Sequence, residues 1–118
     1  MTTIELNIQA HRRQDRHTLV LTGELDLASA PALEGMVAQA CADGASELVL
    51  DLSRLTFIDS SGLKAILSAR GLCAANRCDL FLTPAKAPVQ RLFELTRLID
   101  RLPFRESSPP EPADARPG

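Results

Sequence analysis

The order in which strand-type and helix-type segments alternate limits the fold of this chain more than any other feature. Apolar and polar residues alternate at residues 4–10, which predicts a first strand, and residues 18–22 are predicted to form a second strand that pairs with it. The polar stretch between them, residues 11–16, predicts the turn of a β-hairpin. From there helix-type and strand-type segments alternate, so the whole order is β-β-α-β-α-β-α. Strands separated by helices become parallel neighbours, which predicts an α/β domain with one mixed sheet of four or five strands.

Three or four helices are expected to pack on this sheet. The first begins at Ser29, a good N-cap residue, and stops at Gly44. The second begins within residues 59–62 and runs to about residue 76, and the third spans about residues 88–96. A fourth, short helical turn is expected at residues 98–101.

The two remaining strands are short apolar runs. Residues 47–51 and 80–82 have the continuous apolar centre that is typical of strands covered on both faces. Residue 23 is expected to end the second strand, and residues 53–56 are predicted to form a loop. The predicted core includes the side chains of Leu48, Val49, Leu50, Leu80 and Leu82.

The last residues differ in composition from the rest of the chain. Residues 105–118 contain four of the eight prolines and no large apolar residue. Such a segment buries too little apolar surface to offset the entropy of ordering it. The sequence therefore predicts a folded domain at residues 1–104 and a disordered, Pro-rich tail at residues 105–118.

Composition argues against several classes of protein. The 13 basic and 15 acidic residues give a net charge of −2, and the only aromatic residues are four Phe, so a nucleic-acid-binding surface is not expected. No apolar run approaches the roughly 20 residues that cross a membrane, and the first residues do not have the pattern of a signal peptide. Three cysteines without a Cys-x-x-Cys pair indicate reduced thiols in a cytoplasmic protein, with no metal and no cofactor.

The segment Asp59-Ser60-Ser61-Gly62 carries the most chemical information. It stands at a junction between a strand and a helix, where the first backbone amides lack helical partners and favour negative charge. A phosphate on a hydroxyl there would be stabilised locally. The alternative is that Asp and Ser residues simply cap the helix. A hydrolase is not expected, because residue 58 is Ile rather than Gly and no histidine lies near.

A second segment, Thr22-Gly23-Glu24-Leu25-Asp26, ends a predicted strand in an acidic loop. Two carboxylates could suggest a metal or acid–base chemistry. Because no third ligand or oriented base is visible in the sequence, a solvated loop is the default interpretation.

Taken together, these segments resemble the STAS domain, and within it the antagonists of anti-sigma factors in bacterial partner-switching systems. The resemblance covers about residues 4–104. It rests on the elements Thr22–Asp26, Ala30-Pro31, Val49–Leu52, Phe57–Leu63 and Arg91–Thr96, which follow one another in the family's order.

The resemblance implies a function and a set of site residues. Ser60 would be the phosphoacceptor of an anti-sigma factor with a serine-kinase fold, to which ATP and magnesium belong. The unphosphorylated antagonist would bind that kinase and release sigma; the phosphorylated form would not bind, and a serine phosphatase would reset it. The implied partner-binding residues are Glu24, Asp26, Asp59, Ser60, Ser61 and Gly62.

The resemblance also leaves alternatives open. Some STAS modules are never phosphorylated and act as subunits of lipid-transport complexes or as signalling scaffolds. Those modules commonly alter the hydroxyl residues, and this chain keeps both. Lys64 and Arg97 stand where the family often has Gly, and Arg97 is expected to give the third helix a different end. The expected oligomeric state is a monomer or a weak dimer, with no enzymatic activity and no contact with nucleic acid or membrane.

Overall fold

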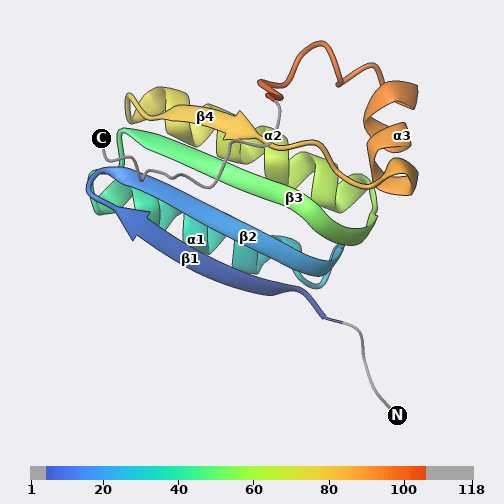
Figure 1. Cartoon of the computed structure of the whole chain (residues 1–118), viewed down its shortest axis with the longest axis horizontal. Coiled ribbons are helices and arrows are strands. Elements are labelled where there is room, and N and C mark those ends of the chain that lie inside the picture. The colour runs from blue at the N-terminus through green and yellow to red at the C-terminus, as the bar shows by residue number, and fades with distance from the viewer. Residues whose placement is uncertain (1–4, 106–118) are drawn as a thin grey trace, which may run out of the picture.

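A four-stranded mixed sheet with three helices makes up the part of the chain that the structure, a computed structural model, describes: residues 5–105. The sheet order is β1-β2-β3-β4. The first pair is antiparallel, and β3 and β4 each join parallel to the preceding strand (Figure 1). The elements are β1 (Asn7–Arg13), β2 (Arg16–Leu25), α1 (Ala30–Ala42), β3 (Glu47–Ile58), α2 (Ser60–Ala75), β4 (Asp79–Leu82) and α3 (Ala87–Leu95). The predicted α/β class and element order are confirmed.

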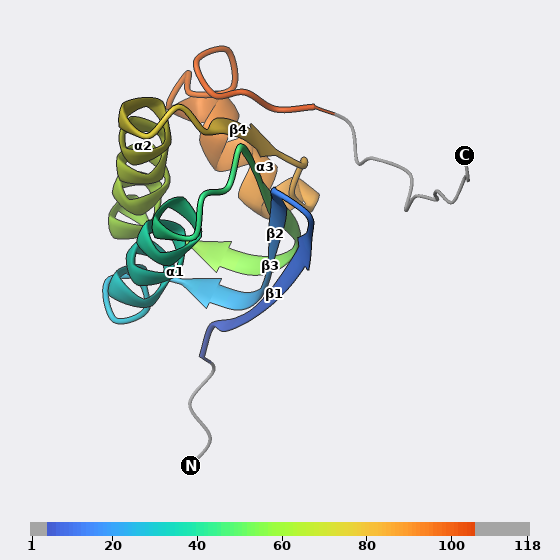
Figure 2. The same ribbon diagram turned by 90° about the vertical axis from the view of Figure 1, so that its left-hand side faces the viewer.

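The helices cover the sheet unequally. Figure 2 shows α1 and α2 side by side on one face of the sheet. Helix α3 lies beyond the end of β4 and packs against β3 (Figure 1). The chain then returns along β4, where Phe104 pairs in parallel with Leu82, and an edge-to-face contact joins the rings of Phe93 and Phe104, 5.1 Å apart.

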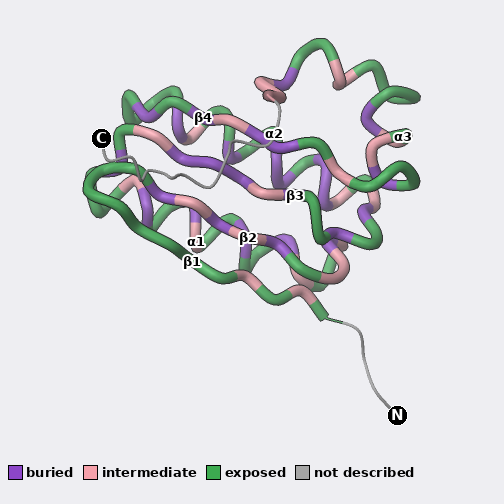
Figure 3. Tube along the Cα trace, viewed as in Figure 1, coloured by how far each residue is buried: buried purple, intermediate pink, exposed green. Residues whose placement is uncertain are grey.

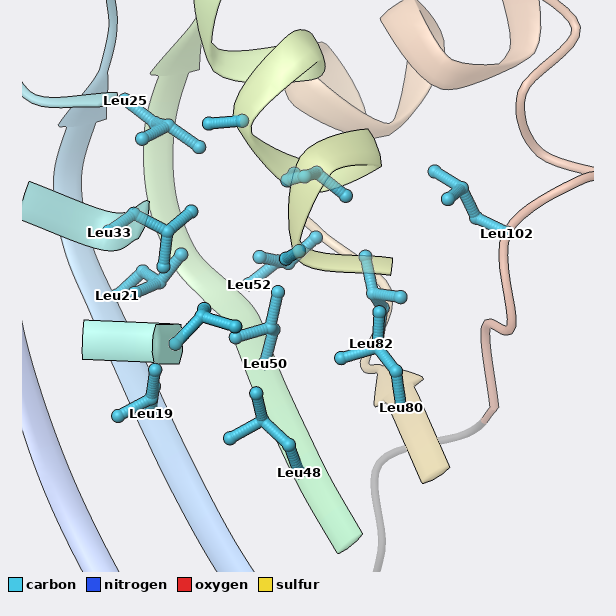
Figure 4. Packing of buried hydrophobic residues seen from close by; sticks show 14 of the residues in the cluster. Leu19, Leu21, Leu25, Leu33, Leu48, Leu50, Leu52, Leu80, Leu82 and Leu102 are labelled. Carbon is cyan, nitrogen blue, oxygen red and sulfur yellow. The ribbon is translucent and has the colours of Figure 1, made fainter. Parts of the chain in front are cut away.

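The core lies between the sheet and the two helices, and half of its buried residues are leucines (Figure 4). β3 is buried along its first half, whereas the edge strand β1 is largely exposed (Figure 3). The five residues predicted to form core positions, Leu48, Val49, Leu50, Leu80 and Leu82, are all buried. Burying a leucine contributes about 1.5–3 kcal/mol, so this layer supplies the main drive for folding.

The predicted loop at residues 53–56 is wrong, because β3 continues through it. β3 has 12 residues and β2 has ten, and the pairing shifts twice, between Val20 and Thr22 and between Gly23 and Glu24. The two extra residues of β3 are bulges. Leu52, Leu55 and Ile58 are all buried but are three residues apart, whereas a regular strand buries every second residue. The sequence here therefore lacks the alternation that would have predicted a strand.

The hairpin is tighter and longer than predicted. β1 extends to Arg13 and β2 begins at Arg16, so only two residues form the turn, with Gln14 at a φ of 58°. The polar residues 11–13 belong to the strand because this edge of the sheet is exposed. β2 also continues past Gly23 to Leu25. Gly23, at a φ of 111°, allows close approach of the backbone, since a Cβ there would lie 2.1 Å from the Glu5 carbonyl oxygen.

All three helices end in the same way. Gly44, Arg77 and Arg97 take positive φ values of 84°, 57° and 63°, and the next residue's amide bonds back to the carbonyl five residues earlier. This is the Schellman motif. Gly44 was predicted as such a stop, which is confirmed. The expectation that Arg97 changes the end of the third helix is wrong, because Arg97 adopts the conformation that Gly would. The predicted fourth helical turn is a hydrogen-bonded turn, with the amides of Arg101 and Leu102 bonded to the Leu98 carbonyl.

The three thiols lie together where α1 and α2 end. Cys73 and Cys78 are buried and Cys41 is partly buried, and all three are free. The Cys78 amide bonds to the Cys73 carbonyl at 2.9 Å, so their side chains form the contact that accompanies a Schellman motif. Burial raises the pKa of the Cys73 thiol, and the neighbouring thiols of Cys78 and Cys41 raise it further.

Asp51 joins the middle of β3 to the end of β4. Its Oδ1 atom accepts hydrogen bonds from the Ser53 hydroxyl at 2.6 Å and the Thr83 hydroxyl at 3.0 Å. The Thr83 hydroxyl oxygen in turn accepts from the Leu52 amide. Burial by itself would raise the pKa of Asp51, but these hydrogen bonds and nearby Arg54 together lower it. This carboxylate has a structural role in the sheet.

The C-terminal segment is fastened to the sheet up to the last described residue. The Arg105 guanidinium lies 3.7 Å above the Phe81 ring and 3.1 Å from the Glu47 carboxylate. Its amide bonds to the Leu82 carbonyl. The rest of the tail that was predicted to be disordered, residues 106–118, lies outside the described residues.

Candidate functional site

The candidate site lies at the edge of the sheet where β2 and β3 end. The loop at residues 26–29 leaves β2, and α2 begins directly after β3. The Asp59 amide bonds to the Leu25 carbonyl at 3.2 Å, which joins the two strand ends. Residues far apart in the sequence, near 26 and near 60, are thus brought to one corner.

Asp59 caps α2 with one carboxylate oxygen and holds the neighbouring loop with the other. Its Oδ1 atom accepts from the Gly62 amide at 2.9 Å, and its Oδ2 atom accepts from the Leu27 amide at 3.3 Å. The first bond was expected from the N-cap pattern; the second could come only from the fold. A single side chain therefore ties the start of α2 to the loop after β2.

Ser60 is the first residue of α2, and its side chain is exposed. Among the described residues, no hydrogen bond holds its hydroxyl. Ser61 is partly buried, and Lys64, one turn further along α2, is exposed. Of the two serines, Ser60 is the one whose hydroxyl a second protein can reach most directly.

Gly62 permits the close contact between α2 and β2 on which this corner depends. It is buried, and a Cβ at this position would lie 2.5 Å from the Leu25 carbonyl oxygen and 2.7 Å from Ile58 Cγ1. Because a Cβ atom does not lie closer than 3.0 Å to another heavy atom, any side chain at position 62 would push α2 and β2 apart. The backbone that approaches Gly62 within this chain is that of Leu25 in β2.

Asp26 and Ser29 order the loop between them. Asp26 Oδ1 accepts from the Ser29 amide at 3.1 Å, and the Asp26 amide donates to the Ser29 hydroxyl oxygen at 2.9 Å. The Ser29 hydroxyl lies 2.9 Å from the Glu24 carbonyl oxygen. Ser29 is the N-cap residue of α1, as predicted, but its side chain does not cap the helix. Glu24 enters this network through its backbone.

The two acidic residues that the resemblance implies for partner binding are only partly exposed. Asp26 and Asp59 lie at the same corner as Ser60, but both are partly buried. The reason is that each carboxylate accepts backbone hydrogen bonds, which places it against the chain. Both acids therefore contribute to the shape of the corner as well as to its charge.

Two residues of this corner were not predicted from the sequence. Leu27 stands between the two hydrogen-bonded acids, and 74% of its surface is exposed. Ser29 was considered only as a cap. An apolar residue inside the polar stretch Asp26-Leu27-Ala28-Ser29 is the signal that could have drawn attention to both.

Other site types were sought in the same part of the chain. Over residues 5–105, no group of three His, Cys, Asp or Glu side chains has the arrangement of a metal site. None of the described helices combines the length and apolar character needed to span a bilayer. A groove of about 320 Å³ between α1 and α2 is lined by Glu34, Val37, Ser68, Ala69 and Leu72, and contains none of the predicted site residues.

Known proteins share this sequence pattern and fold. The STAS domain profile matches residues 7–109. The anti-sigma-B factor antagonist of Staphylococcus aureus (strain NCTC 8325 / PS 47) is 26% identical over 105 residues, which is 89% of this chain and 97% of that protein.

Two solved structures are similar over most of their length. The crystal structure of an anti-sigma factor antagonist from Mycobacterium paratuberculosis has a TM-score of 0.76 and 26% identity, covering 87% of each chain. The anti-sigma factor antagonist SpoIIAA in its unphosphorylated form has a TM-score of 0.73 and 21% identity, covering 86% of this chain and 89% of that one, and supports the fold. The profile match covers most of the chain and these structures share its fold, so this chain belongs to the STAS domain family.

Proposed function

We propose that this chain is a cytoplasmic antagonist of an anti-sigma factor and that phosphorylation of Ser60 controls its binding. The observation that carries the proposal is the exposed Ser60 at the first position of α2, beside Asp59, whose carboxylate caps the helix. Relatives named as anti-sigma factor antagonists match across most of the chain and add support.

The start of α2 suits a phosphoacceptor. A kinase partner holding ATP would bring its γ-phosphorus to the Ser60 oxygen. The new P–O bond would form as the bond to ADP breaks, and the hydroxyl proton would pass to a base on the kinase. The resulting dianion would lie at the positive end of the α2 dipole, which this chain tolerates.

The same dianion would end partner binding. The phosphate adds a charge of about −1.5 to −2 at pH 7 and three bulky acceptor oxygens. Asp26 and Asp59 already place carboxylates at this corner. A partner surface shaped around a neutral hydroxyl, with ATP phosphates close by, would meet like charge. A loss of about 3 kcal/mol weakens binding more than a hundredfold.

The test uses purified full-length chain and each serine-kinase-type anti-sigma factor encoded in the same genome. We expect ATP-dependent addition of one phosphate, located on Ser60 by fragment mass spectrometry. Ser60→Ala should bind constitutively, and Ser60→Asp should bind weakly. Ser61→Ala is the matched control and should still be phosphorylated.

Two results would contradict this proposal. A phosphate found on Ser61 would overturn the assignment of the site. Absence of phosphate on either serine, together with absence of binding to every such anti-sigma factor, would favour the alternative of a STAS module that is never phosphorylated.

A further inference from the structure

Leu27 is the most exposed large apolar side chain among the described residues, at 74%, and the equally exposed Leu95, at 72%, lies elsewhere at the end of α3. Isolated exposed leucines are normal on protein surfaces and need no explanation. The two leucines differ in how they are held. The environment of Leu27, rather than its exposure, is therefore the informative feature.

The backbone on both sides of Leu27 is fixed. Its own amide donates to Asp59 Oδ2, 3.3 Å away and 32 residues later in the chain. On either side, Asp26 and Ser29 bond to each other through side chain and backbone. A loop tied at three points holds the backbone of Leu27 in place, so that little backbone freedom remains to be lost on binding.

The same tie places Leu27 beside Ser60. The carboxylate that receives the Leu27 amide belongs to the residue immediately before Ser60 and caps the helix that begins there. Any protein that encloses the Ser60 hydroxyl must therefore cover the loop as well. The surface around Leu27 is acidic on its inner side, because Asp26 and Asp59 flank it, and carries exposed Lys64 one helical turn from Ser60.

We infer that Leu27 is an apolar anchor for the anti-sigma factor and that Asp59 is a positioning residue, which holds Leu27 ready through its second carboxylate oxygen. The occupant of this surface is an anti-sigma factor with an apolar pocket at the rim of its ATP site. The inference rests on the proposed function and adds the residue that gives the unphosphorylated chain its affinity for that partner.

The first experiment compares Leu27→Ala with Leu95→Ala, two truncations of equally exposed leucines. Binding of the unphosphorylated chain to the ADP-bound anti-sigma factor is measured by titration calorimetry. Leu27→Ala should raise Kd at least about tenfold, as expected for an apolar anchor at the centre of an interface. Leu95→Ala should change Kd less than twofold, and neither variant should lower the melting temperature noticeably.

The second experiment separates positioning from direct contact. Asp59→Asn keeps an oxygen to cap α2, because Asn is as good an N-cap as Asp. Its amide nitrogen would face the Leu27 amide, so the bond to the loop is lost. If Asp59 acts through Leu27, Asp59→Asn should weaken binding about threefold to tenfold in the original chain and much less in the Leu27→Ala background.

The outcomes distinguish this inference from the proposed function. If the unmodified chain binds no anti-sigma factor of its genome, the proposed function fails and the inference fails with it. If the unmodified chain binds and Leu27→Ala binds equally well, only the inference is overturned. Additive losses from the two substitutions would show that Asp59 contacts the partner itself, which would remove its positioning role.

Discussion

Helix α2 begins at a polar corner and ends at an apolar one. At its start, Asp59, Ser60 and Gly62 combine a capped amide, an exposed hydroxyl and a close backbone contact. At its end, Cys73 and Cys78 are buried against each other, and Arg77 closes the helix with its backbone alone. Every helix leaves backbone N–H groups at its start and C=O groups at its end without helical partners. In α2 a side chain binds the first set, and backbone amides bind the second.

The two ends differ in whether their polar groups are already hydrogen-bonded within the chain or remain available to a partner. At the end of α2, the last carbonyls accept hydrogen bonds from amides of the same chain, and the thiols of Cys73 and Cys78 are buried. The α2 start needs only one carboxylate to cap it, which leaves the Ser60 hydroxyl exposed. Both ends of the helix therefore contribute to stability, but recognition is proposed only for its start.

The largest expected effect comes from two glycines of α2. Gly62→Ala should lower the free energy of unfolding by about 3 kcal/mol, because the new methyl group would meet the Leu25 carbonyl. Gly71→Ala, in the same helix with nothing within 4 Å, should instead raise it by about 0.5–1 kcal/mol. Urea unfolding measures both. Equal effects of the two substitutions would contradict the close contact between Gly62 and Leu25.

The thiol end should limit stability in alkaline solution. Folding raises the pKa of Cys73 and Cys78 above the ordinary value of 9.0, mainly through burial. Above that pH the unfolded chain loses thiol protons that the folded chain keeps, so stability should fall as pH rises. The slope is at most about 1.4 kcal/mol per pH unit for each thiol.

Unfolding measured between pH 8 and 10.5 tests this expectation. Cys73→Ala is the matched variant and should show a shallower slope, even if its stability at pH 8 is lower. A slope that is the same with and without Cys73 would assign the alkaline loss to other groups.

The acidic loop at the other end should matter more for binding than for folding. Asp26→Ala removes the acceptor of the Ser29 amide and should cost about 1 kcal/mol of stability. Its effect on anti-sigma factor binding should be larger than its effect on the free energy of unfolding. Denaturant unfolding and calorimetry on the same sample provide the comparison. Complete unfolding of the variant would make this acid structural only.

The smallest expected effect concerns the closing residue of α2. Arg77 has a φ of 57°, a conformation that costs an ordinary residue about 1–2 kcal/mol. Arg77→Gly should therefore stabilise the domain by up to about 1 kcal/mol, because glycine's greater entropy in the unfolded chain offsets part of the gain. The binding of partners should not change. Differential scanning calorimetry should detect a rise of a few degrees in melting temperature.

The sequence by itself determined the element order, the leucine core and the cap of α2. These depend on local periodicity and on residues within one helical turn, as Asp59 and Gly62 are. The sequence did not predict that Arg97 would close α3 like a glycine, because the strain of one residue is outweighed by the burial of Phe93 and its neighbours.

Only the tertiary structure decided what depends on pairing between distant residues. The bulges that turn residues 53–56 into strand arise where β3 must match the shorter β2, and no local pattern encodes that mismatch. The bond from Leu27 to Asp59 joins residues 32 positions apart. Short-range patterns fix which residues are apolar, capped or bent. The corner that presents Leu27 and Ser60 together exists because two parallel strands end side by side.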